Sequence, residues 1–395
     1  MNYFLWALLL FAQIQLSSSN RFEEEFLWPE IELLEKEGTL DLLIQERMVE
    51  IQSLNESWRL FAYGEKMHHL EFFSHFDSIF QQGRLVLETE GAGAAYILYD
   101  QYDTPQFIIK PTDENIFCLH NPKQFASPFL EPRVKRDIPL YRAAQTDALC
   151  YELATICHLE HITPKAVLSL LSHPSFFLIN KGEPQEKLCS IQDYLKGTLP
   201  LRQVLEEFFS NSLLEEDLLE RFDQEDFEDI QLLVWLTFDN DAHADNFRVY
   251  LKKTSLQGFP VYGMQKIDNS LAFPERNSEF SNALMYFPNA LLPISSKIRD
   301  QIRSLPLAKI KEAIQKFGLG SSVSAFEERI STLQKLIEKE DLTYYECSLR
   351  LSLLEKPDGA PLALSNESLE NLEYTAKDLM KIKDFVELFE KTDSF

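Results

Sequence analysis

The residues best suited to chemistry lie between Phe238 and Phe247, a segment rich in Asp, Asn and Ala. Asp241 and Asn246 have a spacing that suits phosphoryl transfer, because a carboxylate can orient an attacking hydroxyl and an amide oxygen can hold a metal ion. His243 lies between them. A surface turn is also rich in Asp and Asn, so this segment alone leaves both interpretations open.

A further acidic residue, Asp268, follows the apolar run that ends at Ile267. Asn246 and Asp268 would supply two hard oxygen ligands beside the phosphates of ATP. Such a site suits Mg²⁺, with Mn²⁺ as an alternative, because Mg²⁺ keeps several of its waters and rarely has an all-protein cage. The loop and Asp268 together favour an ATP- and metal-dependent phosphotransferase over two acidic turns.

Groups that could hold the phosphates of ATP precede this loop in the chain. Gly91 and Gly93 belong to a run of small residues, which lets backbone N–H groups approach phosphate oxygens closely, although a simple hairpin turn is the alternative. Lys110 ends the apolar run Phe107–Ile109 and could hold phosphate oxygens as a compact charge. A solvated surface lysine is the alternative for Lys110.

A phosphate-binding lysine of this kind needs a carboxylate partner on a neighbouring helix. Asp147 and Glu152 both lie on a helix that the sequence predicts for residues 141–161. Five residues at roughly 100° each place them on different faces, so at most one should pair with Lys110. Glu152 lies beside the apolar stripe of the helix, which suits a position facing the cleft, but the sequence leaves open which of the two pairs with Lys110. For either residue, a solvated acid is the alternative.

The elements that must position these residues change in character along the chain. Short β-prone runs occur at 85–87, 96–99, 107–109, 175–180, 188–192, 247–251 and 262–267. Helical periodicity occurs at 141–161, 201–209, 213–222, 227–237 and beyond 295. We therefore predict an α+β, bilobal fold with a helical extension (21–83), a small antiparallel-sheet N-lobe (84–196), a mainly helical C-lobe (197–340) and a helical C-terminal tail (341–395).

Charge and the N-terminal residues bear on partners and location. The formal net charge of the 395 residues is -25, which argues against nucleic-acid binding and against a polybasic membrane anchor. Residues 1–20 contain an apolar run followed by three serines, a pattern that predicts a signal peptide and hence secretion or export. A buried N-terminal helix is the alternative, and the chain would then be cytoplasmic.

These motifs resemble those of the phosphatidylinositol 3-/4-kinase superfamily, most closely the catalytic domain of type II phosphatidylinositol 4-kinases. Ile267–Pro274 is similar to the metal segment Ile-Asp-Asn-Gly-Leu-Ala-Phe-Pro, and Asp241–Asn246 resembles the loop Asp-Arg-His-x-x-Asn. Phe107–Pro111 resembles the strand with the ATP lysine, and Asn121–Lys123 the Asn-Pro-Lys downstream of it. Ser190–Gln192 resembles the strand that enters the interlobe hinge.

The resemblance implies a kinase-like fold that transfers the γ-phosphate of ATP to a hydroxyl of a phosphoinositide or another substrate. It implies that Lys110 holds the ATP phosphates, that Asp241 orients the nucleophile and that His243 assists at the transferring phosphate. It further implies metal binding by Asn246 and Asp268. The adenine would be flanked by Gln192, Asp193 and Tyr194.

The sequence departs from the family pattern at several places. Ala242 replaces the Arg of the loop, Ser270 replaces a Gly of the metal segment, and Ala95 replaces a Ser. The cysteine-rich segment of the type II enzymes is absent between Asn121 and Pro139. The substrate hydroxyl could thus belong to a lipid head group or to a protein, and membrane association stays open. The alternatives are a protein kinase or nucleotide transferase on the same fold, or a non-catalytic kinase-like interaction module.

Overall fold

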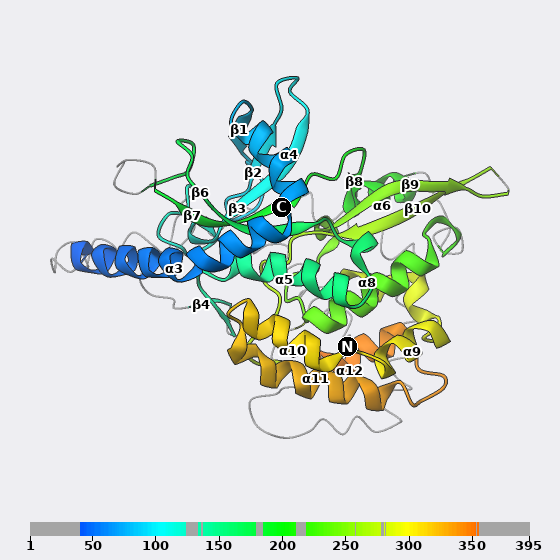
Figure 1. The fold of residues 1–395 in the computed structure, drawn as a ribbon. Helices are drawn as coiled ribbons and strands as arrows, with labels where there is room; N and C mark the ends of the chain where they lie inside the picture. Colours follow the sequence, from blue (N-terminus) through cyan, green and yellow to red (C-terminus); the bar gives the residue numbers. More distant parts are fainter. Residues whose placement is uncertain are drawn as a thin grey trace.

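The computed structural model describes residues 40–123, 133–135, 137–178, 185–210, 219–256, 258–277, 280, 282–352 and 354 (Figure 1). The predicted signal peptide at 1–20, the start of the extension and most of the C-terminal tail lie outside the described residues. The described part has an antiparallel-sheet lobe and a mainly helical lobe, so the predicted α+β, two-lobed architecture is confirmed.

The first lobe is built on a five-stranded sheet in the order β1-β2-β3-β7-β6, with all neighbours antiparallel. Its strands are β1 (Arg84–Leu87), β2 (Tyr96–Tyr99), β3 (Pro105–Pro111), β6 (Ala166–Leu171) and β7 (Lys187–Asp193). Side chains alternate between the two faces of a strand. Phe107 and Ile109 on β3 are therefore buried on one face, while Lys110 points to the other.

Two helices of the predicted extension cover this sheet, α3 (Leu40–His68) and α4 (Leu70–Phe80). On α4, Phe72 and Phe76 pack edge-on against Phe107 of the sheet. The longer α3 contacts β6 and β7 and also reaches the helical lobe, where Phe61 packs against Phe317. The described part of the extension is thus integrated into both lobes (Figure 1).

One predicted strand is wrong. We expected a strand at 175–180, but residues 175–178 form no strand, and β7 pairs instead with β6 at Ala166–Leu171. The run Ala-Val-Leu-Ser-Leu-Leu is almost entirely buried, so it lacks the alternation that marks a half-exposed strand. Phe176 packs into the core of the sheet although it lies outside any strand.

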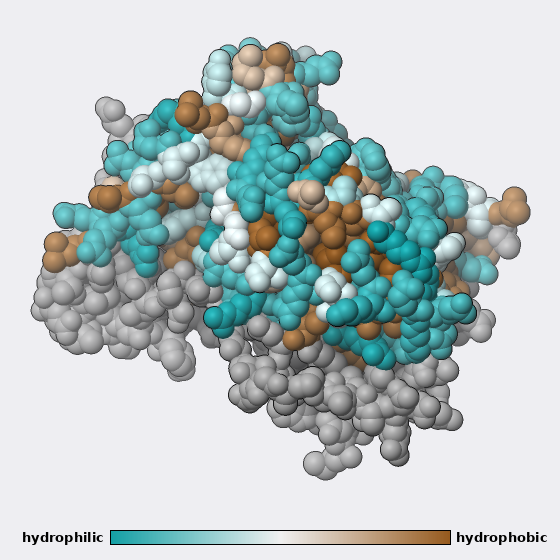
Figure 2. Space-filling model, turned by 60° about the horizontal axis from the view of Figure 1, so that its bottom comes forward, coloured by the Kyte–Doolittle hydropathy of each residue, from teal (hydrophilic) through white to brown (hydrophobic). Residues whose placement is uncertain are grey.

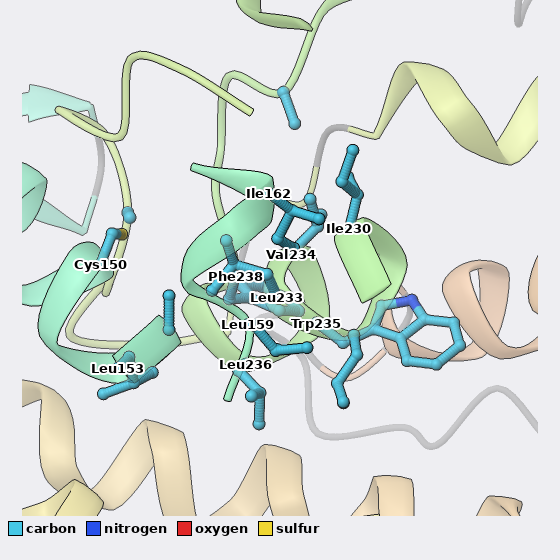
Figure 3. Packing of buried hydrophobic residues seen from close by; sticks show 14 of the residues in the cluster. Cys150, Leu153, Leu159, Ile162, Ile230, Leu233, Val234, Trp235, Leu236 and Phe238 are labelled. Carbon is cyan, nitrogen blue, oxygen red and sulfur yellow. The ribbon is translucent and has the colours of Figure 1, made fainter. Parts of the chain in front are cut away.

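The second lobe surrounds α8, which is buried from Asp226 to Thr237. Its helices are α6 (Leu201–Ser210), α8 (Gln224–Thr237), α9 (Ser296–Arg303), α10 (Leu307–Lys316), α11 (Val323–Leu336) and α12 (Tyr344–Leu351). Figure 3 shows buried side chains of α5 (Ala143–Ile156) and of the turn after it beside those of α8. Trp235 of α8 donates a hydrogen bond to Ser348 Oγ of α12 at 2.9 Å.

A small sheet and several short elements complete the described structure. The sheet has the order β10-β9-β8. Its strands are β8 (Leu199–Pro200), β9 (Phe247–Thr254) and β10 (Pro260–Lys266), and a separate pair is formed by β4 (Arg133–Lys135) and β5 (Ile138–Pro139). The 3₁₀ turns are η1 (Thr112–Glu114), η2 (Glu160–Ile162), η3 (Ala244–Asn246), η4 (Ala283–Tyr286), η5 (Pro288–Leu291) and η6 (Gly320–Ser322).

The described part of the face drawn in Figure 2 is largely hydrophilic, with hydrophobic residues gathered near its middle. In the described ranges, none of the helices combines the length and the apolar character that crossing a bilayer requires.

Candidate functional site

Lys110 joins the two lobes through a pair of carboxylates. Its Nζ atom lies 2.9 Å from Asp268 Oδ1 and 3.4 Å from Asp147 Oδ2. Burial alone would lower the pKa of Lys110, but the two neighbouring carboxylates outweigh it and hold the pKa above its usual value. Lys110 therefore stays charged at neutral pH, a property that phosphate binding would require.

Asp147, and not Glu152, is the helical partner of Lys110. The Asp147 side chain is fully buried, accepts a hydrogen bond from the Asn269 N–H at 2.8 Å and another from the Ser190 hydroxyl at 3.2 Å. Burial raises its pKa above the usual range despite these contacts. Glu152 makes no ion pair within the described residues.

The sequence left the choice between Asp147 and Glu152 open, and the structure shows why the apolar stripe could not decide it. The first half of α5 is buried nearly all round, from Ala143 to Cys150. An apolar stripe on such a helix does not mark the side that faces the site, because the helix packs against neighbours on several sides. Asp147 is therefore held inside the protein at a position that the pattern of apolar residues could not single out.

Asp268 lies on a turn whose backbone is fixed by hydrogen bonds from Lys266. Its φ angle is 50°, which is uncommon for a residue other than glycine. The fully buried Lys266 donates hydrogen bonds from Nζ to the carbonyl oxygens of Ile267 (2.8 Å) and Asp268 (3.1 Å). The same Nζ lies 2.5 Å from Asp239 Oδ2, which is also buried. This ion pair links the turn of Asp268 to the end of α8.

The Asp268 carboxylate is held in its charged form. The Asp268 side chain is 41% accessible. The surrounding protein groups still remove part of the water around the carboxylate, and this desolvation by itself would raise its pKa. The charge of Lys110 and the N–H of Ser270 outweigh that effect and hold the pKa well below its usual value. Asp268 is therefore ionised at neutral pH.

The loop from Asp241 to Asn246 is fixed at both ends. The N–H of Asp241 donates to Asp239 Oδ1 at 2.9 Å, and the side-chain amide of Asn246 donates to the carbonyl oxygen of Asp241 at 2.7 Å. The Asn246 carbonyl accepts the N–H of Ile267 at 2.9 Å, which places the loop next to Asp268. The Asp241 side chain is 35% exposed.

His243 and Asp245 complete this loop. His243 Nδ1 accepts the N–H of Asp245 at 3.3 Å, so the ring proton belongs on Nε2, which lies 3.7 Å from Asp241 Oδ2. Arg202 of α6 donates two hydrogen bonds to the Asp245 carboxylate, from Nε to Oδ1 at 2.8 Å and from Nη2 to Oδ2 at 2.6 Å. The loop is therefore also tied to the first helix of the second lobe.

A metal ion at this site would find one carboxylate and one amide as protein ligands. Asp268 and Asn246 offer hard oxygen atoms, a donor set that fits Mg²⁺ because this ion keeps several waters and takes phosphate oxygens as further ligands. Within the described part of the chain, no group of three or more His, Cys, Asp or Glu residues could hold a metal ion.

The residues predicted to flank adenine lie where β7 ends. Gln192 is buried between Ile108 and Ala166 in the sheet. The N–H groups of Asp193 and Tyr194 donate to Lys165 and Gln106, each at 3.0 Å. The structure thus places Gln192 and Asp193 at the end of the strand next to β3 and Tyr194 directly after it, and their role toward adenine stays a prediction.

The predicted glycine loop lies between β1 and β2. Gly91 has φ +72°, a conformation that L side chains rarely adopt. A Cβ at Gly93 would lie 2.5 Å from Asn115 Oδ1. A larger residue would therefore strain the backbone at Gly91 and would displace the Asn115 side chain at Gly93.

Sequence reasoning missed the ion pair of Lys266 and Asp239. Each residue stands in a motif that the sequence singled out, Asp239 before the loop and Lys266 before Asp268. Opposite charges at the buried ends of two segments that had to meet were the available signal. Neither position could be recognised as buried before the segments were placed together.

No protein-family model matches this chain. It is 26% identical over 235 residues to phosphatidylinositol 4-kinase gamma 6 of Arabidopsis thaliana, covering 57% of this chain and 36% of that protein. It is also 26% identical over 233 residues to phosphatidylinositol 4-kinase gamma 7 of the same plant, covering 55% and 33%. The chain spans about a third of the length of these relatives.

Solved kinase structures are more distant. A Golgi casein kinase has a TM-score of 0.40 and 14% identity, covering 70% of this chain and 77% of that chain. The Rio2 kinase from Chaetomium thermophilum, solved as an ADP/Mg²⁺-phosphoaspartate complex, has a TM-score of 0.30 and 12% identity, covering 80% and 75%. The sequence matches confirm the predicted resemblance to phosphatidylinositol kinases, and the finer likeness to the type II group stays a prediction: this chain is similar to plant phosphatidylinositol 4-kinases of the gamma group.

Proposed function

We propose that this chain is an ATP- and Mg²⁺-dependent phosphotransferase that transfers the γ-phosphate of ATP to a hydroxyl group. The observation that carries the proposal is the position of Lys110, paired with Asp147 inside the sheet lobe and with Asp268 beside the Asp241–Asn246 loop. Positioned cations, a metal-binding carboxylate and a hydroxyl-orienting carboxylate are the parts that phosphoryl transfer needs. The similarity to phosphatidylinositol 4-kinases supports it.

Each side chain has a distinct role in this proposal. Lys110, held in place by Asp147, binds phosphate oxygens of ATP. Asp268 and Asn246 hold Mg²⁺, which when bound neutralises charge on the phosphates. Asp241 accepts a hydrogen bond from the substrate hydroxyl and orients it for attack.

The remaining groups in the loop keep these atoms in place. His243 carries its proton on Nε2, where it can donate to an oxygen of the transferring phosphate. Lys266 fixes the backbone of Asp268 through two carbonyl oxygens. Because little covalent chemistry is asked of the protein, such positioning provides most of the rate gain.

Within this class, we propose the hydroxyl of a phosphoinositide head group as the substrate. The support is the similarity to relatives that are named phosphatidylinositol 4-kinases. The loop Arg of that superfamily is replaced by Ala242, which is fully buried and whose carbonyl accepts the Ala283 N–H at 2.8 Å. The site therefore uses its loop without a cation at this position.

Transfer of labelled γ-phosphate from ATP tests the proposal. The parent is incubated with Mg²⁺ and either phosphatidylinositol vesicles or a protein mixture, alongside Asp241→Asn and Asp268→Asn. We expect each variant to lose about 100-fold or more in rate, because each removes a group that acts on the reacting atoms. Asp300→Asn is the matched control, since this carboxylate is 76% exposed and pairs only with neighbouring surface groups.

The acceptor that becomes labelled separates the substrate classes. Labelled lipid supports the phosphoinositide assignment, and labelled protein assigns the site to protein phosphorylation. Mass spectrometry distinguishes a phosphate from a nucleotide on any modified protein. Equal activity of the parent and both Asn variants would overturn the assignment of Asp241 and Asp268.

A further inference from the structure

The loop from Glu90 to Ala94 is held along its length by one segment, residues 114–123, which follows β3. Lys123 Nζ donates to the carbonyl oxygens of Glu90 (2.5 Å) and Gly91 (2.8 Å). Asn121 Nδ2 donates to the carbonyl oxygen of Ala92 at 2.9 Å. Two side chains therefore hold three consecutive carbonyl groups of the loop.

The other contacts of the same segment fix the far end of the loop. The N–H of Ala94 donates to the carbonyl oxygen of Glu114 at 3.0 Å. The Asn115 side chain fills the space beside Gly93 that a Cβ would need. The loop thus lies directly against this segment from Glu90 to Ala94.

Because of peptide geometry, this arrangement also fixes the direction of the backbone N–H groups of the loop. In a trans peptide the C=O of one residue and the N–H of the next point in opposite directions. Holding the carbonyl groups of residues 90–92 toward Asn121 and Lys123 therefore turns the N–H groups of Gly91, Ala92 and Gly93 away from them. None of these three N–H groups has a hydrogen-bond partner among the described residues.

The backbone N–H groups just before Gly91 already have hydrogen-bond acceptors. The N–H groups of Thr89 and Glu90 donate to Glu88 Oε1, at 2.9 and 3.4 Å. The free donors therefore begin at Gly91, whose positive φ allows successive N–H groups to converge. Successive backbone N–H groups of this kind form an anion-binding concavity.

The supporting segment is itself anchored by a buried ionic cluster. Lys187 Nζ lies 3.0 Å from Asp113 Oδ2 and 2.7 Å from Glu114 Oε1. His120 Nδ1 lies 2.6 Å from the same oxygen of Asp113, and Tyr96 donates to Glu114. All five side chains are almost completely buried, so the segment forms a firm support for Asn121 and Lys123.

We propose that Asn121 and Lys123 are positioning residues that hold the loop carbonyls and thereby preorganise the N–H groups of Gly91, Ala92 and Gly93 to bind the phosphates of a nucleotide. The proposal rests on the proposed function and deepens it. Neither side chain has to touch the nucleotide, because each acts through the peptide group that it fixes. Without them the loop would have to be ordered when phosphate binds, at a cost in affinity.

Binding measured by calorimetry tests this role with three probes: MgATP, adenosine and inorganic tripolyphosphate. The variants are Lys123→Met, Lys123→Arg and Asn121→Leu. We expect Lys123→Met and Asn121→Leu to weaken MgATP and tripolyphosphate about tenfold, since each removes hydrogen bonds that fix the donor groups. Adenosine affinity should not change, and Lys123→Arg should retain most of the phosphate affinity.

The Asn121→Leu substitution changes no charge, so it distinguishes positioning of the loop from direct attraction between a lysine charge and the phosphates. Lys123→Met also removes a positive charge, which would weaken phosphate binding without any change in the loop. A loss in both variants supports positioning, whereas a loss in Lys123→Met alone overturns it in favour of direct charge attraction. Lys311→Met is the matched control, because Lys311 makes a surface ion pair with Glu327.

Failure of this inference differs from failure of the proposed function. If the parent transfers phosphate and Lys123→Met binds MgATP like the parent, the inference is overturned and the function stands. If tripolyphosphate binding depends on both residues but no phosphate is transferred, the inference stands and the function fails. Equal weakening of adenosine and MgATP, with a lower unfolding temperature, would show general damage and would also overturn the inference. A parent that binds none of the probes overturns both.

Discussion

At the scale of single residues, the site is organised by buried charges that each have a partner. Lys110 lies between Asp147 and Asp268, and Lys266 lies against Asp239. A buried charge costs several kcal/mol to desolvate, so each partner is needed for the other to stay inside the protein. The two lysines have complementary roles, since Lys110 binds carboxylate side chains and Lys266 fixes the backbone below Asp268.

Removing the charge of Lys266 should therefore be strongly destabilising. We expect Lys266→Met to lower the free energy of unfolding by about 3–5 kcal/mol, because Asp239 would be left buried without its cation. Urea denaturation followed by circular dichroism measures the change. The double variant Lys266→Met with Asp239→Asn should recover part of the loss, since no unpaired charge remains. Equal stability of parent and Lys266→Met would refute a structural role for this ion pair.

Removing the charge of Asp147 should affect ATP binding more than stability. We expect Asp147→Asn to raise the KM for ATP about tenfold with a smaller change in kcat, because Lys110 would lose the carboxylate that positions it for phosphate. Glu152→Gln on the same helix is the matched control and should leave both constants unchanged. Steady-state kinetics at varied ATP concentration tests both variants, and an identical effect of the two substitutions would argue against the pairing.

At the scale of elements, the sequence predicted several short β-prone runs as strands and missed one buried apolar run. The strand runs at 85–87, 96–99 and 107–109 lie within β1, β2 and β3. The buried strand Ala166–Leu171 was missed because its apolar residues face both sides. The same limit explains Glu152: periodicity predicts which residues are apolar, whereas the tertiary contacts of α5 decide which acid faces Lys110.

The candidate site was partly predictable because its motifs carry their residues at fixed spacing. Asp241, Asn246, Asp268 and Lys110 could be singled out without a structure, since their spacing reports local loops and strand ends. The supports of the site were not predictable in this way. Arg202, Lys266 and Lys123 act across distances in sequence that only the fold closes.

The docking of α3 on the helical lobe should be sensitive to one glycine. Gly318 has φ +73°, and a Cβ there would lie 2.7 Å from the Trp58 ring of α3. We expect Gly318→Ala to lower the free energy of unfolding by about 1–3 kcal/mol, from backbone strain together with the clash. Gly320→Ala is the control, because a Cβ at Gly320 meets nothing within 4 Å and its φ is not positive. Thermal unfolding measures both variants, and equal midpoints for Gly318→Ala and Gly320→Ala would contradict the prediction.

At the scale of the whole molecule, ionisable groups act on stability in opposite directions. Asp268 has a lowered pKa, so it adds stability that is present above its unfolded pKa and lost as the pH falls through its folded pKa. Glu114 acts in the opposite sense. Its burial raises its pKa to about 7, against the effect of Lys187, so the folded state holds its proton longer than the unfolded state does.

The contribution of Glu114 should therefore be greatest at low pH. It is fully present below pH 4.5, the ordinary value of the group, and is lost as the pH rises through about 7. We expect the free energy of unfolding of the parent, relative to Glu114→Gln, to fall by roughly 3 kcal/mol at most over this window. Gln keeps the shape of Glu114 but does not titrate, so the difference between the two proteins isolates this group from the other carboxylates. Urea denaturation at intervals from pH 4.5 to pH 7.5 measures it, and parallel stability curves would show that Glu114 ionises alike in the folded and unfolded chains.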